Sequence, residues 1–143
     1  MSGGYSDDLL SHARRPNGAG KLTGPLRRGR ADNPLCGDEV DVDVREEAGR
    51  LIDVAHRTRG CAFTVASASL LARCVPGLTA VEALDRVATL LRELAGTGPL
   101  LPELAPLGAV RMYPARVRCA LLPWEALRAA LGSPLRELDD ASA

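Results

Sequence analysis

A strict alternation of apolar and charged residues in segment 39–45 constrains the fold of this chain more than any other feature. One side of the segment carries valines and the other carries charged residues, namely Val40, Val42 and Val44 against Asp41, Asp43 and Arg45. Such alternation is typical of a β-strand with one buried face. Because residues 46–49 suit a turn and residues 51–56 suit a second strand, the pattern predicts an antiparallel hairpin.

Helical patterns dominate the chain after this hairpin. Residues 62–75 are apolar and rich in small side chains, which indicates a buried helix. A capping box formed by Thr79 and Glu82 begins the next helix, which ends at Gly96. The expected apolar face of that helix consists of Val81, Leu84, Val87, Leu91 and Leu94.

Two further helices are expected near the ends of the chain. Ser6 can cap a short helix that stops before Pro16. Residues 96–110 are rich in Pro, Gly and Leu, and they predict a connector with one short helical turn. The last helix is expected to begin near Pro123 and to end at Gly132.

Strands followed by helices predict an α+β fold, in which helices pack on one face of a small antiparallel sheet of about three strands. The length of 143 residues suits a single domain over residues 1–143. We expect its core to cover about residues 5–138. An irregular basic arm at about 16–31 would contain one edge strand, and the tail after Leu138 would be frayed.

The charge balance argues against nucleic acid as a partner. The net charge is zero, from 18 basic and 18 acidic residues, so the whole molecule has no electrostatic hold on a polyanion. Residues 1–30 differ from the rest, with six basic and two acidic side chains. These basic side chains either form a solvated surface or dock on an acidic partner.

The apolar runs of the chain are short. Nothing after Met1 resembles a signal peptide, and no run approaches the ~20 residues needed to span a bilayer. We therefore predict a cytoplasmic protein with no membrane partner. In that compartment the four cysteines indicate metal-binding, catalytic or merely buried thiols rather than disulfides.

Three of the four cysteines lie where predicted elements meet. Cys36 lies in a turn before the hairpin, Cys61 between the hairpin and the buried helix, and Cys119 just ahead of the last helix. A thiol near a helix N-terminus feels the positive end of the helix dipole, which favours the thiolate. The spacings fit no zinc-finger pattern, so inert buried thiols remain an alternative. Cys74, inside the apolar helix, is interpreted in that way.

Read together, three segments resemble the NifU/IscU/SufU family of iron–sulfur cluster assembly proteins. They are Asn33-Pro34-Leu35-Cys36-Gly37-Asp38, Gly60-Cys61-Ala62 with Ala66-Ser67-Ala68-Ser69, and Pro114-Ala115-Arg116-Val117-Arg118-Cys119 followed by Trp124. Tyr5-Ser6 and residues 12–18 also look like the opening of the family. The resemblance covers roughly residues 5–132 and implies a SufE/NifU-like α+β fold.

The resemblance also implies a metal site made of Cys36, Asp38, Cys61 and Cys119. Three thiolates and one carboxylate suit tetrahedral zinc or the irons of a nascent cluster. Zinc is therefore the expected cofactor, with iron or a transient [2Fe–2S] cluster as the alternative. The single hard ligand, Asp38, makes such a site less closed than one made only of thiolates.

Three departures place the resemblance nearest the SufU branch. Arg118 stands where IscU proteins have a His before the last Cys, and residues 112–116 replace their chaperone-recruiting Leu-Pro-Pro-Val-Lys segment. The distance between Cys61 and Cys119 is also longer than in IscU proteins. SufU proteins are zinc-containing sulfur acceptors for a SufS-type cysteine desulfurase.

The resemblance thus implies a zinc-dependent persulfide carrier rather than a stand-alone enzyme. Cys36 would accept sulfur from the desulfurase, and downstream iron–sulfur assembly proteins would receive it. Arg116 and Arg118 are candidates for persulfide or partner contacts, although both could equally be solvated arginines. The alternatives are a scaffold on which a [2Fe–2S] cluster is assembled, and an interaction protein with a structural zinc.

Overall fold

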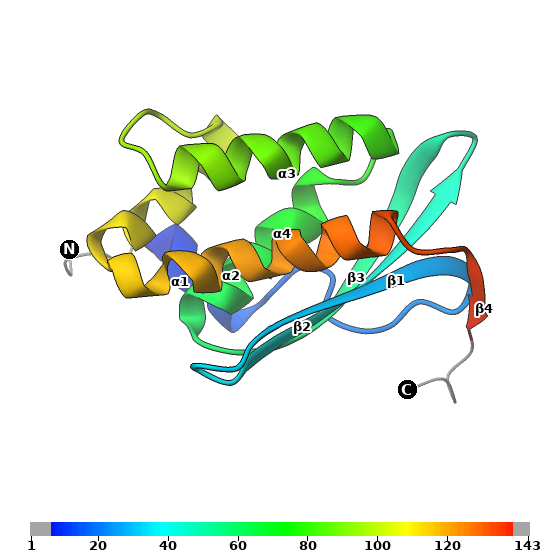
Figure 1. The fold of residues 1–143 in the computed structure, drawn as a ribbon, viewed down its shortest axis with the longest axis horizontal. Coiled ribbons are helices and arrows are strands. Elements are labelled where there is room, and N and C mark those ends of the chain that lie inside the picture. The colour runs from blue at the N-terminus through cyan, green and yellow to red at the C-terminus, as the bar shows by residue number, and fades with distance from the viewer. Residues whose placement is uncertain (1–6, 139–143) are drawn as a thin grey trace.

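The computed structural model describes residues 7–138, and its helices all lie on one side of a single antiparallel sheet (Figure 1). The sheet has four strands in the order β3-β2-β1-β4, so the α+β prediction is confirmed with one strand more than expected. The elements are α1 (Asp7–Arg14), β1 (Gly24–Asn33), β2 (Asp38–Glu47), β3 (Arg50–Arg59), α2 (Ala62–Cys74), α3 (Ala80–Leu94), the 3₁₀ helices η1 (Pro102–Met112) and η2 (Pro114–Arg116), α4 (Val117–Leu131) and β4 (Arg136–Leu138).

The predicted hairpin is present as β2 and β3, and each strand is longer than its apolar pattern. The side chains of Val40, Val42 and Val44 face the helices and are buried. Because side chains alternate along a strand, Asp38 at the start of β2 lies on this same helix-facing side. The strand pattern therefore carries a carboxylate into the protein interior.

The arm predicted at about 16–31 is irregular only in its first half, and the strand expected within it is present. Residues 24–33 form β1, which pairs with β2 along residues 27–33 and with β4 at residues 24–26. Apolar alternation is missing from β1 because arginines occupy its outer face and Gly29 its helix-facing side. The strand is held in register by charge, since Arg28 pairs with Asp43 and Arg30 with Asp41.

Four of the six basic side chains of residues 1–30, Arg14, Arg15, Lys21 and Arg30, are exposed, whereas Arg28 is half-buried in an ion cluster on the sheet. Asp43 is completely buried on the outer side of the sheet and contacts both Arg28 and Arg57. The segment before β1 covers it, because the Leu22 N–H donates a 3.0 Å hydrogen bond to Asp43 Oδ2. The same segment pairs with the edge of β3, where His56 N–H donates to the Gly18 carbonyl oxygen at 2.8 Å.

We expect this buried ion cluster to make the metal-free protein sensitive to acid. Burial would raise the pKa of Asp43, but hydrogen bonds from Arg28, Arg57 and the Leu22 N–H outweigh it and lower the pKa from 3.8 to about 2. A depressed pKa contributes stability that is complete above pH 3.8 and is lost as the pH falls towards 2, worth about 2 kcal/mol. Urea unfolding between pH 5 and about 2 should show this loss. The loss should shrink in Asp43→Asn, and an equal loss in both proteins would contradict the assignment.

The last helix, α4, begins earlier than predicted. Pro123, expected near its start, lies inside it, and the helix begins at Val117 after the short turn η2. Proline lacks an N–H, so the carbonyl oxygen of Cys119 has no helical donor four residues on. Because α4 begins at Val117, Cys119 lies within its first turn and not ahead of it.

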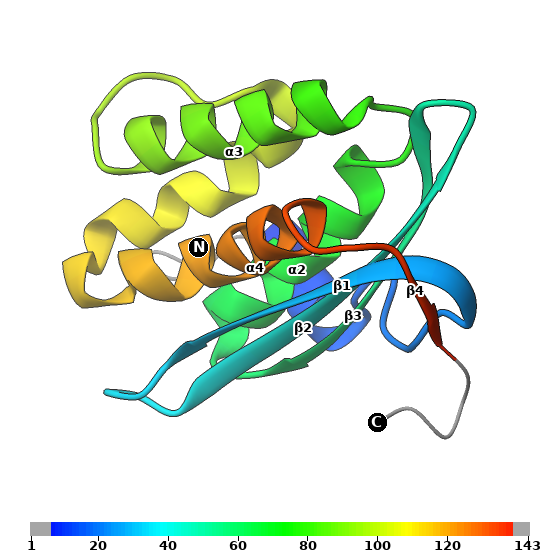
Figure 2. The same cartoon turned by 45° about the vertical axis from the view of Figure 1, so that its right-hand side comes forward.

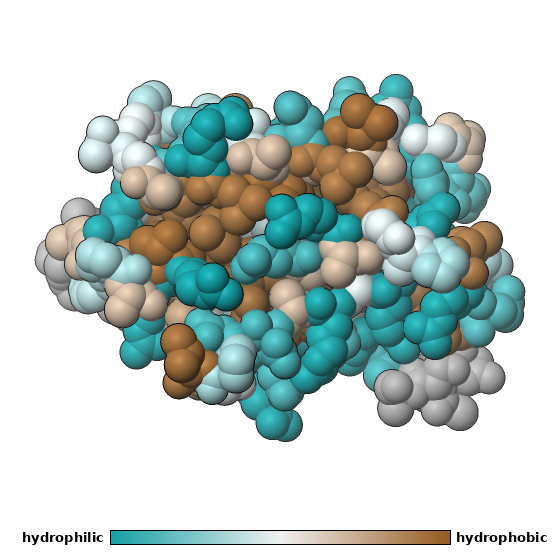
Figure 3. All heavy atoms as spheres, in the orientation of Figure 1, coloured by the Kyte–Doolittle hydropathy of each residue, from teal (hydrophilic) through white to brown (hydrophobic). Residues whose placement is uncertain are grey.

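The buried face of helix α3 matches the predicted one only in part, at Val87 and Leu94. Its capping box is confirmed, with Thr79 and Glu82 exchanging hydrogen bonds of 2.9 and 3.1 Å. However, Val81 and Leu84 are exposed, and the buried residues are Ala83, Val87, Leu90 and Leu94. In Figure 3, apolar side chains form a band along the valley between α3 and α4. The buried face differs from the predicted one because α3 packs on α4 and η1 rather than on the sheet.

The N-terminal segment is fastened to α2 by polar side chains. His12 Nδ1 lies 2.7 Å from the Ser69 hydroxyl, and the Asn17 N–H donates to the same oxygen at 2.8 Å.

The connector predicted at 96–110 is mostly the 3₁₀ helix η1, longer than the single turn expected. Tyr5, the Ser6 cap and the tail after Leu138 lie outside the described residues. Within residues 7–138, no helix combines the length and apolar character needed to cross a bilayer.

Candidate metal centre

The turn between β1 and β2 presents Cys36 at an exposed tip of the molecule. Asn33 organises this turn, because its carbonyl oxygen accepts hydrogen bonds from the N–H groups of Cys36 and Gly37 at 3.2 and 2.8 Å. Gly37 has φ of +79°, a left-handed conformation that favours glycine. The turn therefore places an exposed thiol two residues before the buried Asp38.

The other two cysteines come from the N-terminal ends of two helices. Cys61 is the residue that precedes the first turn of α2, where it is half-buried. Cys119 lies in the first turn of α4 and is only 2% exposed. Thr64, one turn into α2, lies between them and the sheet: its hydroxyl donates a 2.7 Å hydrogen bond to Asp38 Oδ2.

Three of the four predicted ligands converge on one point. The ligand atoms of Cys36, Asp38 and Cys119 all lie within 4.8 Å of one another. Cys61 lies outside this group, but its thiol is near enough to that of Cys119 for each to shift the pKa of the other, and it lies 3.5 Å from the Thr64 hydroxyl. The fold therefore brings the N-terminal ends of α2 and α4 and the β1–β2 turn together at one centre.

The donor set fits a soft divalent cation such as zinc. Thiolates and a carboxylate are ordinary zinc ligands, at about 2.3 and 2.0–2.2 Å from the ion. Asp38 is 5% exposed, yet within residues 7–138 no Arg, Lys or His side chain forms an ion pair with it. A buried carboxylate without a counter-charge is costly, and a bound cation would supply that charge.

The two helix-borne thiols differ in acidity. Burial would raise the pKa of Cys61, but its contact with the Thr64 hydroxyl and hydrogen bonds from the N–H groups of Thr64 and Phe63 lower it below its usual value. Burial raises the pKa of Cys119 to about 12, and the neighbouring Cys61 and Asp38 act in the same direction. The prediction that a helix start favours the thiolate thus holds for Cys61 and is wrong for metal-free Cys119, because burial outweighs the dipole.

The two candidate arginines have different surroundings. The Arg116 guanidinium is hydrogen-bonded to the Cys61 sulfur, and this contact raises the pKa of Arg116, as do the charges of Cys61 and Cys119. Arg118 is exposed, and among the described residues no hydrogen bond or ion pair joins it to the site. Cys74 lies at the far end of α2, where burial raises the pKa of its thiol.

Comparison with known proteins identifies the family of this chain. The family described as the NifU-like N-terminal domain matches residues 4–133. The chain belongs to this family. The resemblance found in the three cysteine-containing segments is thereby confirmed.

Known relatives of this NifU-like chain include proteins named IscU and a protein named SufU, the two branches that its motifs suggested. The iron–sulfur cluster assembly scaffold protein IscU of Streptococcus pyogenes serotype M1 is 30% identical, covering 89% of this chain and 82% of the relative. The zinc-dependent sulfurtransferase SufU of Bacillus subtilis is 26% identical, covering 86% of each chain. The crystal structure of a NifU-like protein from Brucella abortus superposes with a TM-score of 0.78 at 28% identity, covering 88% of this chain and 90% of that one.

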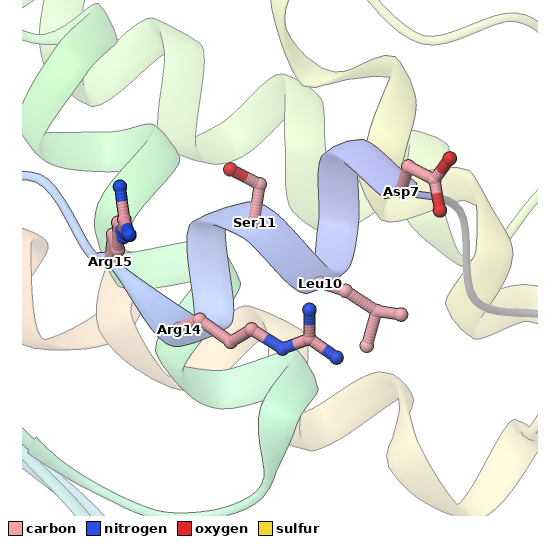
Figure 4. Close-up of a pocket in the computed structure, with 5 residues that line it drawn as sticks. All are labelled: Asp7, Leu10, Ser11, Arg14 and Arg15. Atoms are coloured by element: carbon pink, nitrogen blue, oxygen red, sulfur yellow. The ribbon is translucent and has the colours of Figure 1, made fainter.

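The larger surface hollows of this NifU-like domain lie away from the cysteines. One, of about 410 Å³, is lined along α1 by residues 7–15 (Figure 4). Another, of about 450 Å³, lies where α1, α2 and η1 meet and includes His12 and Arg73. Neither of these two hollows is lined by a proposed ligand.

Two residues that touch the centre were missed from the sequence. They are Thr64, which contacts Asp38 and Cys61, and Gly60, where an added Cβ would lie 2.9 Å from Asp38 Cγ. The three-residue spacing of Cys61 and Thr64 at a helix start was a usable signal, because such residues face the same way.

Proposed function

We propose that this protein works in iron–sulfur cluster assembly as a zinc-dependent sulfur acceptor for a SufS-type cysteine desulfurase. The observation that supports it is the convergence of the Cys36 and Cys119 thiols on the carboxylate of Asp38, which is buried and lacks a counter-charge. The similarity to a protein named zinc-dependent sulfurtransferase adds support. Downstream iron–sulfur assembly proteins would receive the sulfur.

In this proposal Cys36, Asp38, Cys61 and Cys119 hold the zinc ion. Bound zinc would keep the cysteines deprotonated without redox chemistry of its own. Without metal, the raised pKa of Cys119 disfavours its thiolate. A bound cation would therefore be needed to keep this cysteine deprotonated. Cys61 belongs to the set because its thiol lies near enough to that of Cys119 for each to shift the pKa of the other.

Cys36 is the proposed sulfur acceptor. Of the four cysteines, Cys61 and Cys74 are half-buried and Cys119 is buried, whereas Cys36 is exposed and lies in a turn rather than in a helix. Its thiolate would attack the terminal sulfur of the desulfurase persulfide, forming a new S–S bond at Cys36. The desulfurase cysteine would leave as a thiolate with the electron pair of the broken S–S bond. Arg116, beside Cys61, supplies a nearby positive charge for the anionic product.

A cluster scaffold is the second candidate function, because the relative from Streptococcus pyogenes is named a scaffold protein. The same ligands would then hold the irons of a [2Fe–2S] cluster as cargo. Metal and sulfide analysis of protein purified without air separates the two functions. Zinc without colour supports the carrier, iron with labile sulfide supports the scaffold, and zinc without sulfur acceptance would mark a structural site.

We expect removal of zinc to destabilise the protein without unfolding it. A ligand that binds only the folded state stabilises that state, and the core of β2, β3 and the helices lies largely outside the site. Chelation should lower the melting temperature by roughly 5–10 °C. Re-addition of zinc should restore the original value. An unchanged melting curve after verified zinc removal would contradict the proposed role of the metal.

A further inference from the structure

Thr64 contacts two of the proposed ligands with one hydroxyl group. Its Oγ1 donates the 2.7 Å hydrogen bond to Asp38 Oδ2 and lies 3.5 Å from Cys61 Sγ. The side chain is fully buried in the first turn of α2, where the conformation of a β-branched residue is restricted. A hydroxyl has a single proton to donate, and the short bond to Asp38 uses it.

Gly60 encloses the same carboxylate from another direction. An added Cβ there would lie 2.9 Å from Asp38 Cγ and 2.9 Å from Thr64 Cβ. Gly60 is not among the glycines with positive φ, so its missing side chain serves the close approach and not an unusual backbone conformation. The Asp38 carboxylate is therefore enclosed by the Gly60 backbone and bound by the Thr64 hydroxyl.

We propose that Thr64 is a positioning residue, which fixes the Asp38 carboxylate for metal binding by holding one of its oxygens. This inference rests on the proposed function, because it takes the metal site as given. Removal of a hydrogen-bond partner of a metal ligand commonly lowers metal affinity by about 10–100-fold. Without the hydroxyl, Asp38 Oδ2 loses its donor in a buried position and the carboxylate is free to turn.

The test compares zinc affinities of full-length variants by competition with a chromophoric chelator. Thr64→Val keeps the side-chain shape and is expected to weaken zinc binding by about tenfold or more. Thr64→Ser retains the hydroxyl and should stay within about twofold of wild type. The matched control is Thr58→Val, which removes a hydroxyl that lies 2.8 Å from His56 Nδ1 and should leave the affinity unchanged.

Gly60→Ala gives a second variant that does not alter the hydroxyl. Its new Cβ would press on the carboxylate, so zinc affinity should again fall by about tenfold or more. The melting temperature of each metal-free variant reports whether the fold is intact. This second variant keeps the inference testable if Thr64→Val does not fold.

A double-mutant cycle separates positioning from general damage. In an Asp38→Ala background, Thr64→Val should change zinc affinity by less than about twofold, because the group that it positions is gone. An equal loss in both backgrounds, or a loss in Thr64→Ser as large as in Thr64→Val, would overturn the role of Thr64. Wild-type protein that binds no zinc would overturn the proposed function as well, which distinguishes the two failures.

Discussion

Gly29→Ala is expected to destabilise this protein more than any other single methyl addition to its sheet. Gly29 faces α4, and an added Cβ would overlap the backbone N of Ala130 and the carbonyl oxygen of Ala126. It would also lie 2.7 Å from the carbonyl carbon of Ala129. These are backbone atoms of a helix, so no side-chain rotation relieves the clash.

The helix must therefore move away from β1, and α4 carries Cys119 with it. We expect a loss of unfolding free energy on the order of 3 kcal/mol or more, because overpacking against backbone exceeds the usual cost of an extra methyl group. Urea unfolding of the zinc-loaded protein measures it. Gly98→Ala is the matched control, since a Cβ there meets no atom within 4 Å, and it should change stability by less than about 0.5 kcal/mol. Similar stabilities for the two variants would contradict the packing of α4 on β1.

Cys36→Ala is expected to abolish sulfur acceptance while leaving the fold intact. Cys36 lies in an exposed turn, where its thiol lies 3.8 Å from the Asn33 carbonyl oxygen. Because the side chain is exposed, its removal costs little packing, and the other three cysteines are half-buried or buried. Stimulation of a SufS-type desulfurase, measured as alanine formed from cysteine, should fall by more than about tenfold.

Intact-mass measurement completes that experiment. Wild-type protein should gain the mass of one sulfur atom, removable by reductant, and Cys36→Ala should not. Cys74→Ala is the control, because Cys74 lies at the far end of α2, and it should behave as wild type. Full stimulation and a sulfur adduct in Cys36→Ala would exclude Cys36 as the acceptor. Cys61, half-buried and with a lowered pKa, would then be the next candidate.

The sequence predicted those parts of the fold whose signals are local. The alternation at 39–45 predicted β2, and the Thr79–Glu82 capping box predicted the start of α3. β1 was predicted only as one edge strand of an irregular arm, without its bounds, because its helix-facing Gly29 and outward arginines are explained only by partners on α4 and β2. Pro123 misplaced the start of α4 because a proline signals a helix start more often than it occurs inside one.

The site was predicted by motif and not by spacing. The three cysteine segments pointed to Cys36, Asp38, Cys61 and Cys119, and the structure brings three of them within 4.8 Å with Cys61 beside them. The position of Asp38 follows from strand alternation, since it lies on the valine side of β2. The high pKa of Cys119 was not predictable, because it arises from burial between elements distant in sequence.

The zinc content of single variants tests the central claim most directly. Purified wild type and Cys74→Ala should each contain about one zinc per chain, because Cys74 takes no part in the centre. Cys61→Ala and Cys119→Ala should lose most of their zinc, since each removes a thiolate from a four-ligand site. Full zinc in Cys61→Ala together with loss of zinc in Cys74→Ala would contradict the proposed site.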